Sequence, residues 1–270
     1  MISLRPLKDF HFPIAAECIS PDAFESKTCT EIENLTVWEG NKQRKLGDLF
    51  KIEESKAEVI AIAICGDVSK VRRIGSCMTK GELAIRGNAG MHLGEKMKGG
   101  KISVHGNVEG WAGSTMKDGA IEIYGNAGDY LGAPYRGSTE GMRGGSMVIH
   151  GNVGCDAGAH MRNGMIKIHG SSGEFTGFRM CEGTIYVEGD AGRRAGACMV
   201  GGKIVVNGFL EDVLPTFTID SIKPKVKIEE NQAIDGPFYV FLGDLVENGN
   251  GKLYIRKEKN PQLGHYEKLL

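Results

Sequence analysis

The chain has 270 residues, and its 33 Lys and Arg residues almost balance its 34 Asp and Glu residues. This balance excludes a global attraction to nucleic acid or to a membrane surface. No apolar run reaches the roughly 18 residues of a membrane span, and the N-terminus has no continuous apolar signal segment, so we expect a cytoplasmic protein. The seven cysteines contain no CxxC pair, which argues against a disulfide framework and against a cysteine-ligated metal centre.

Residues 1–65 show no internal repeat and end in the apolar run Val59–Cys65. This run leads directly into the first repeating unit, so it predicts the first strand of the repeat region. We expect 1–65 to be an N-terminal cap or docking segment, because the exposed terminal units of a repeat protein need a cover.

Residues 66–208 carry a glycine-rich repeat. Each unit has a methionine nine residues before a closing glycine, and five of the six intervals between these glycines are 19 residues, while one is 26. The methionines are Met78, Met97, Met116, Met142, Met161, Met180 and Met199. A period near 20 predicts a solenoid, whose units stack because none of them can bury a core alone. The methionines lie among aliphatic columns, so we interpret them as core residues and not as a site for a soft metal.

Each unit ends in a period-two alternation of apolar residues, such as Ile121 and Ile123, which predicts one short strand with one face inward. A second glycine, six residues before each closing glycine, suits a corner with positive φ or a close approach of backbones. The pattern predicts an all-β fold, namely a right-handed parallel β-helix of about seven coils with N- and C-terminal capping segments. An asparagine follows the closing glycine in four successive units, and we expect these amides to stack and hydrogen-bond along the axis. They are Asn88, Asn107, Asn126 and Asn152.

Residues 209–270 leave the repeat. The segment PFYVFLGDLVENGNGKLYIRK holds two strand-like runs around a turn that contains Asn-Gly, which predicts a C-terminal cap with a hairpin. We interpret both flanks as parts of one structural domain.

The repeat offers no clear site for chemistry. The glycine strings lead into strands instead of helices, which argues against a nucleotide-binding loop. His105, His150 and His169 share one column and are expected to face solvent, because the neighbouring Ile or Val of each strand points inward. Only His150 and His169 lie on adjacent units, and two stacked imidazoles without a carboxylate or cysteine ligand between them make a weak metal site. Asp156 and Glu174 are the nearest pair of acidic residues on neighbouring coils, which is too little for a polysaccharide-cleaving site. We therefore predict no catalytic, cofactor-binding or metal residue in this chain.

Two features suggest contact with other proteins. The residue after the methionine is basic in four consecutive units, and we name this set the basic ridge: Lys98, Lys117, Arg143 and Arg162. It is either a solvated face or a docking surface for an acidic partner. The 26-residue unit carries seven extra residues within GAPYRGSTEGMRGG, which places Tyr135 and Arg136 on a protruding loop. Insertions in solenoids often lie at binding surfaces, and Tyr and Arg suit interface anchors.

The Met- and Gly-marked repeats, led by ENLTVWEGNKQRKLGDLF, resemble the C subunit of formylmethanofuran dehydrogenase. The repeat is also similar to the C-terminal domain of the glutamate synthase large subunit. The first resemblance implies a scaffold subunit in an archaeal oxidoreductase complex that reduces CO2 and fixes it as N-formylmethanofuran, the first step of methanogenesis. It further implies that the tungsten or molybdenum pterin, the iron–sulfur clusters and an amidohydrolase-like binuclear metal centre lie in partner subunits. The resemblance carries over no catalytic residue to this chain.

Two alternatives stay open. One is the scaffold subunit of a formyltransferase/hydrolase complex in a methylotroph. The other is a stand-alone β-helix that binds a carbohydrate or an anion.

Overall fold

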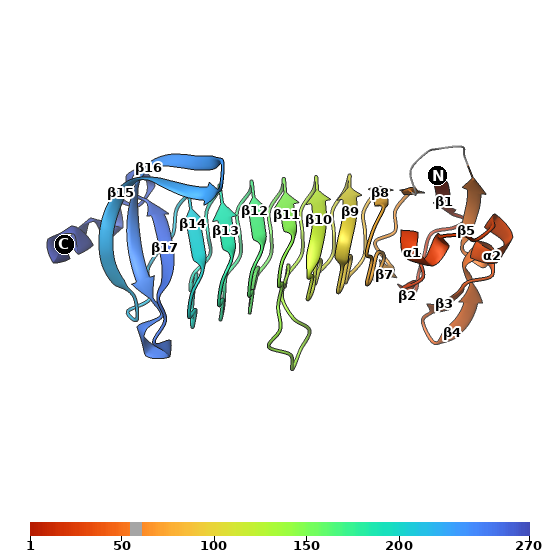
Figure 1. Cartoon of the computed structure of the whole chain (residues 1–270), viewed down its shortest axis with the longest axis horizontal. Coiled ribbons are helices and arrows are strands. Elements are labelled where there is room, and N and C mark those ends of the chain that lie inside the picture. Colours follow the sequence, from red (N-terminus) through yellow and green to blue (C-terminus); the bar gives the residue numbers. More distant parts are fainter. Residues whose placement is uncertain (55–60) are drawn as a thin grey trace.

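The repeating units build the middle of a thirteen-stranded sheet in the computed structural model, which describes residues 1–54 and 61–270. One strand from each unit pairs in parallel with the strands of the neighbouring units (Figure 1). The strands follow one another along the long axis of the molecule. The strands are β8 (Glu82–Arg86), β9 (Lys98–Val104), β10 (Asp118–Ile123), β11 (Ser146–Ile149), β12 (Met165–Ile168), β13 (Thr184–Val187) and β14 (Lys203–Val206). Ile121 pairs with Ile102 on one side and with Met147 on the other, so residues one unit apart are direct neighbours.

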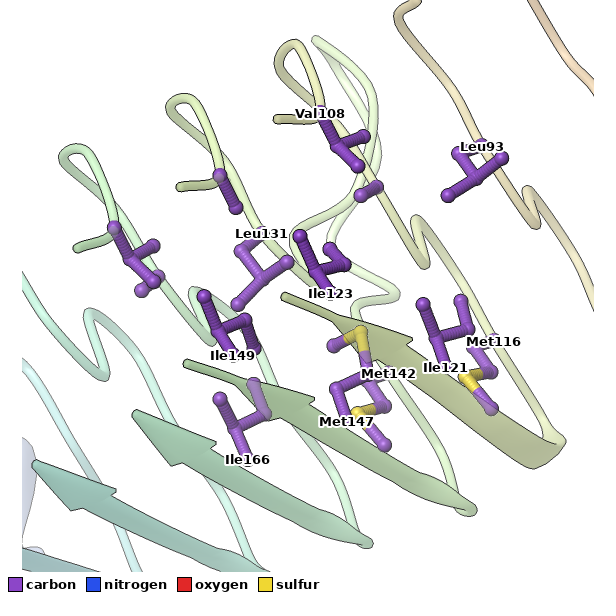
Figure 2. Close-up of a cluster of buried hydrophobic side chains, with 14 of the residues drawn as sticks. Leu93, Val108, Met116, Ile121, Ile123, Leu131, Met142, Met147, Ile149 and Ile166 are labelled. Carbon is purple, nitrogen blue, oxygen red and sulfur yellow. The ribbon is translucent and has the colours of Figure 1, made fainter. Parts of the chain in front are cut away.

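A second ladder of single parallel bridges joins the units on another side, at one fixed position in each of them. It runs through Val68, Ala89, Val108, Ala127, Val153, Ser172, Ala191 and Leu210. Apolar side chains fill the interior between this ladder and the sheet, and all seven methionines of the repeat are 0% exposed. Figure 2 shows Met116 beside Ile121 in this interior. The predicted inward columns are therefore confirmed, and the fold is mostly β with a large, parallel-rich sheet.

Both predicted roles of glycine are present at the corners. Gly119 has a φ of +100°, and a Cβ there would lie 2.8 Å from the carbonyl oxygen of Gly100 in the previous unit. Gly125 closes its unit without positive φ, but a Cβ there would lie 2.6 Å from the carbonyl oxygen of Gly106. Real Cβ atoms do not approach this closely, so the spacing of the stacked backbones excludes any side chain at these positions.

The asparagine column hydrogen-bonds along the stack, but not between amides as predicted. The Oδ1 of Asn107 accepts from the backbone N–H of Asn126 at 2.8 Å, and the Oδ1 of Asn126 accepts from the backbone N–H of Asn152 at 2.8 Å. Asn88 and Asn152 accept in the same way from the following unit. The asparagine side chains thus supply acceptors for backbone N–H groups at the corners, where a donor without a partner would cost free energy.

The N-terminal flank extends the sheet and adds a second one. β6 (Ala61–Cys65) pairs parallel with β8 and with β1 (Ile2–Pro6), and β5 (Phe50–Glu54) then pairs antiparallel with β1. Of the predicted strand Val59–Cys65, residues 59 and 60 lie outside the described residues. A four-stranded sheet joins β4 (Lys42–Lys45), β3 (Thr36–Glu39), β2 (Ile14–Ala15) and β7 (Val71–Arg72). The short elements of this flank are α1 (Pro21–Phe24), α2 (Cys29–Glu33) and the 3₁₀ turn η1 (Leu46–Asp48).

The C-terminal flank contributes three strands: β15 (Thr218–Glu229), β16 (Gln232–Gly243) and β17 (Gly251–Arg256). β17 continues the parallel stack beside β14 and pairs antiparallel with β16, across the segment that contains Asn-Gly. The long β15–β16 hairpin covers part of the outer face of the sheet, where Val226, Ile228 and Phe238 bury Tyr186 and Val205. The 3₁₀ segments η2 (Leu245–Glu247), η3 (Lys257–Lys259) and η4 (Pro261–Leu269) complete the flank. No helix among the described residues is long and apolar enough to cross a membrane.

Candidate interaction surface

The four side chains of the basic ridge lie on consecutive units in one column. The backbone N–H of Lys117 donates to the carbonyl of Met97 at 2.8 Å, and that of Arg143 donates to Met116 at 2.7 Å. Lys98 and Arg162 are placed by the same bond to the methionine one unit earlier, and all four residues are exposed.

The long loop of the 26-residue unit protrudes from the stack between β10 and β11 (Figure 1). Tyr135, which is 54% exposed, leans back over the preceding units, with its ring centroid 5.5 Å from His92 and 5.9 Å from Trp111. The loop returns where the N–H of Gly141 donates to the carbonyl of His160 at 3.1 Å. The predicted protruding loop therefore also makes contacts along the side of the stack.

A basic groove of about 360 Å³ lies where the loop meets the ridge. Its lining consists of Cys77, Lys96, Lys98, Thr115, Lys117, Ser138, Glu140 and Arg143. Arg143 forms an ion pair with Glu140, and Lys96 approaches Glu95 at 3.9 Å. Lys98 and Lys117 form no ion pair within the described part of the chain, so the groove carries excess positive charge. The structure thus brings Lys98, Lys117 and Arg143 together at the loop.

A second recess, of about 190 Å³, also borders the loop and includes Tyr135 and Arg136 in its lining. Its remaining wall contains Trp111, Tyr130, Asp156 and Phe178. The ring of Trp111 stacks on that of Tyr130 with centroids 4.5 Å apart. These aromatic residues were not predicted as part of a site from the sequence. The available signal was the common position of Trp111 and Tyr130, four residues after the asparagine of their units.

The histidine column faces outward, as predicted, but its surroundings differ from the prediction. The Tyr124 ring stacks between His105 and His150, with centroids 4.8 Å from each. Contrary to the expectation from the sequence, carboxylates do contact this column: His150 Nε2 lies 3.2 Å from Glu122, and His169 Nδ1 lies 2.6 Å from Glu188. The contact from His150, against an opposing effect of partial burial, lowers the pKa of Glu122, and Lys101 adds to this effect. Among residues 1–54 and 61–270, no group of three or more His, Cys, Asp or Glu side chains could hold a metal ion.

A further hollow, of about 450 Å³, lies in the N-terminal flank beside β3 and β4. Glu39 on β3 lines this hollow and already pairs with Lys8 at 3.3 Å and with Arg44 at 3.2 Å. These pairs leave the two hollows beside the long loop as the stronger candidates for an interaction surface.

The stacked strands and the exposed loop define a class of repeat-built β proteins with a long lateral surface. No protein-family model matches the chain. A segment is 46% identical over 91 residues to the C subunit of molybdenum-containing formylmethanofuran dehydrogenase 1 from Methanothermobacter marburgensis, and the match covers 34% of this chain and 23% of that protein. Another is 41% identical over 96 residues to the C subunit of tungsten-containing formylmethanofuran dehydrogenase 2 from Methanothermobacter wolfeii, covering 34% of this chain and 36% of that protein.

The chain is thus similar to the C subunit of formylmethanofuran dehydrogenase, and the resemblance stated from the sequence is confirmed. The matched segments span only about a quarter to a third of the length of these curated relatives. A match over nearly the whole chain comes from a solved structure, the formyltransferase/hydrolase complex (FhcABCD) from Methylorubrum extorquens in complex with methylofuran. One of its chains superimposes with a TM-score of 0.85 at 28% identity, covering 94% of this chain and 99% of that one.

Proposed function

We propose that this chain is the non-catalytic scaffold subunit of a formylmethanofuran dehydrogenase complex, which reduces CO2 and fixes it as N-formylmethanofuran. The observation that carries this proposal is the 46% identity over 91 residues to a protein named as the C subunit of that enzyme. Under this proposal the chain is cytoplasmic and archaeal, and the partner subunits hold the tungsten or molybdenum pterin, the iron–sulfur clusters and the binuclear metal centre.

The architecture suits such a role. We propose that the units 66–208 wind as a right-handed parallel β-helix, with 1–65 and 209–270 as its caps. Methionines and aliphatic residues fill the interior of the units, and the asparagine side chains hydrogen-bond from one corner to the next. We expect these contacts to make the stack rigid. A rigid rod with exposed outer columns can hold several partner subunits at fixed relative positions. The basic ridge, with Tyr135 and Arg136 on the adjoining loop, is then the docking surface for an acidic partner.

A second candidate is the scaffold subunit of a formyltransferase/hydrolase complex. It is favoured by the match to the Methylorubrum extorquens complex, since that match covers 94% of this chain. The two candidates share the scaffold role and differ in the partner subunits and in their redox metals.

Native affinity purification of the tagged chain from its own cells, followed by mass spectrometry and metal analysis, tests both candidates. The first predicts co-purification with large subunits that contain tungsten or molybdenum and iron. Co-purification with formyltransferase and hydrolase subunits without these metals would replace it with the second. Isolation of the chain alone at moderate salt would contradict the scaffold role itself.

Charge reversal tests the docking surface. The variant Lys98→Glu, Lys117→Glu, Arg143→Glu, Arg162→Glu should lose co-purifying subunits at moderate salt, because like charges then face the acidic partner. The matched control reverses four exposed lysines in the flanks, Lys27, Lys223, Lys225 and Lys259, and should retain them. Normal assembly of the ridge variant would show that the ridge is merely solvated.

A further inference from the structure

An aromatic column along the stack is interrupted at Asp156. His92, Trp111 and Tyr130 occupy the same position in three successive units, and their rings stack with centroid distances of 5.5 and 4.5 Å. Asp156 takes this position in the next unit and shares its backbone conformation, with a φ of +60° against +65° at Tyr130. Only the side chain changes, so a short carboxylate stands beside the face of the aromatic stack.

The carboxylate of Asp156 has no partner in the described part of the chain. It is half-buried, and neither a hydrogen bond nor an ion pair reaches it. Burial raises the pKa of Asp156, and the neighbouring carboxylate of Asp129 raises it further. Asp129 itself accepts the backbone N–H of Cys155 at 2.8 Å. A half-buried carboxylate beside a second one is unfavourable unless a cation compensates for it.

The recess above Asp156 is open and has the size of a single side chain. Its volume of about 190 Å³ is below the usual range for pockets that bind drug-sized ligands. Trp111, Tyr130 and Phe178 supply aromatic walls, and the long loop closes the remaining side. His160 also lines it, but burial, together with Arg179 and Arg162, lowers the pKa of His160 and so favours its neutral form. Arg136 is the cation at the rim, and it makes no ion pair or ring contact with the described residues.

The same face already shows which group suits such a wall. The guanidinium of Arg194 lies over the ring of Phe175 at 5.2 Å from its centroid, and that of Arg179 lies over Phe178 at 5.4 Å. No cation covers the rings of Trp111 and Tyr130 within the described residues. A guanidinium combines stacking on aromatic faces with paired hydrogen bonds to a carboxylate, which an ammonium cannot do equally well.

We propose that this recess binds the guanidinium group of an arginine side chain presented by a partner protein. The fork of the guanidinium pairs with Asp156, while its plane packs against the face of Tyr130 that the aromatic stack leaves open, in the recess that Trp111 also lines. The recess and the basic groove share Ser138 of the loop, so the proposed site for a cation lies next to a surface that suits anions. This arrangement selects a partner whose arginine lies next to acidic residues. The proposed arginine site in this recess does not depend on which complex the chain joins, and a small probe can test it without any partner.

The test uses the full chain with Trp38→Phe, which leaves Trp111 as the sole tryptophan. Trp38 is 49% exposed in the N-terminal flank, far in sequence from the recess. N-acetyl-arginine N-methylamide is titrated while Trp111 fluorescence is recorded. N-acetyl-citrulline N-methylamide is the matched probe, because it has nearly the same shape without the charge. Saturable binding is expected in the millimolar range for arginine, and at least about fivefold weaker for citrulline.

Three variants sharpen the result. Asp156→Asn should weaken arginine binding at least about fivefold while circular dichroism and thermal unfolding show an intact fold. Glu109→Gln removes an exposed charge two residues from Trp111 and should leave binding unchanged. Arg136→Gln should tighten binding, because it removes a like charge from the rim. Equal binding of both probes, an unaffected Asp156→Asn variant, or no saturation by about 50 mM probe would overturn the assignment.

Discussion

Single residues at the corners decide how closely the units can stack. Gly119 combines a φ of +100° with a carbonyl oxygen 2.8 Å from where its Cβ would lie. Gly137, in the long loop, has a similar φ of +85°, but no atom lies within 4 Å of the corresponding position. This pair separates the cost of the backbone conformation from the cost of the close approach.

We predict that Gly119→Ala destabilises the protein by at least about 2 kcal/mol more than Gly137→Ala. Both variants carry the strain of a left-handed alanine, but only the first forces two backbones apart. Urea unfolding followed by circular dichroism measures the difference. Equal effects of the two substitutions would mean that the stack can relax around a methyl group.

His92 should make stability depend on pH. Burial lowers the pKa of His92, Glu95 opposes this effect, and Arg73 and Arg72 reinforce it. The unfolded chain therefore takes up a proton more readily than the folded one. The stabilisation is complete above the unfolded value of about 6.5 and decreases as the pH falls below it. Tyr135 and Trp111 pack against the ring and add no charge at these pH values.

The measurement compares the free energy of unfolding at about pH 7.5 and about pH 5.5 in the parent chain and in His92→Asn. Asparagine tolerates the φ of +62° at this position, so the backbone should be kept. The loss of stability on acidification should be smaller in the variant. An unchanged loss would assign the pH dependence to other groups.

The asparagine column shows where prediction from the sequence stops at this scale. Its position follows from the period alone. Its partner does not, because the Oδ1 of Asn107 could accept from a neighbouring amide or from the backbone, and the corner geometry decides. In the folded chain the N–H of Asn126 donates to this side-chain oxygen at 2.8 Å. Asp156 escaped prediction as a binding residue for a similar reason, since its lack of a partner appears only in three dimensions.

Among the elements, the repeat strands were predictable and β15 was not. The strands β8 to β14 alternate with period two, and their register repeats with each unit. In β15 the apolar residues Ile219, Ile222, Val226 and Ile228 lie three, four and two positions apart. Irregularities in its pairing with β16, such as that between Lys223 and Lys225, produce this spacing. A bulge shifts the inward face by one residue and thereby hides the alternation.

The β15–β16 hairpin should detach when its apolar face is charged. Val226→Asp with Ile228→Asp would place carboxylates against Tyr186 and Phe238 in the small cluster outside the stack. We expect cleavage by a protease near Glu230 and Asn231 to become faster, because the released hairpin exposes its turn. Lys225→Asp with Lys227→Asp introduces the same residues at exposed positions of the same strand, and its cleavage rate should stay near that of the parent chain.

In the molecule as a whole, the sequence predicted the stacked middle well and the flanks only in outline. A repeated pattern averages out local exceptions over seven units, whereas each flank occurs once. The four-stranded sheet of the N-terminal flank uses strands of two to four residues, and their pairing joins β7 of the repeat to β2 near the N-terminus. Strands this short leave too few residues for a period to be recognised.

Removal of residues 134–140 should separate assembly from stability. The deletion converts the 26-residue unit into a 19-residue unit, and the pairing of β10 with β11 does not involve the loop. We expect a melting temperature within about 4 °C of the parent chain, and loss of the partner subunits in a native purification. A much lower melting temperature would show that the loop supports the stack. Full retention of the partners would remove the loop from the docking surface.

The short and long units share one strand register, so the number of units sets the length of the stack. Each unit advances the sheet by one strand spacing, about 4.8 Å, whether it contains 19 or 26 residues. Gain or loss of a whole unit would therefore change the distance between the two flanks in discrete steps and leave every outward column aligned. Loop length can vary without changing this distance, while the number of units alone sets how far apart the two flanks lie.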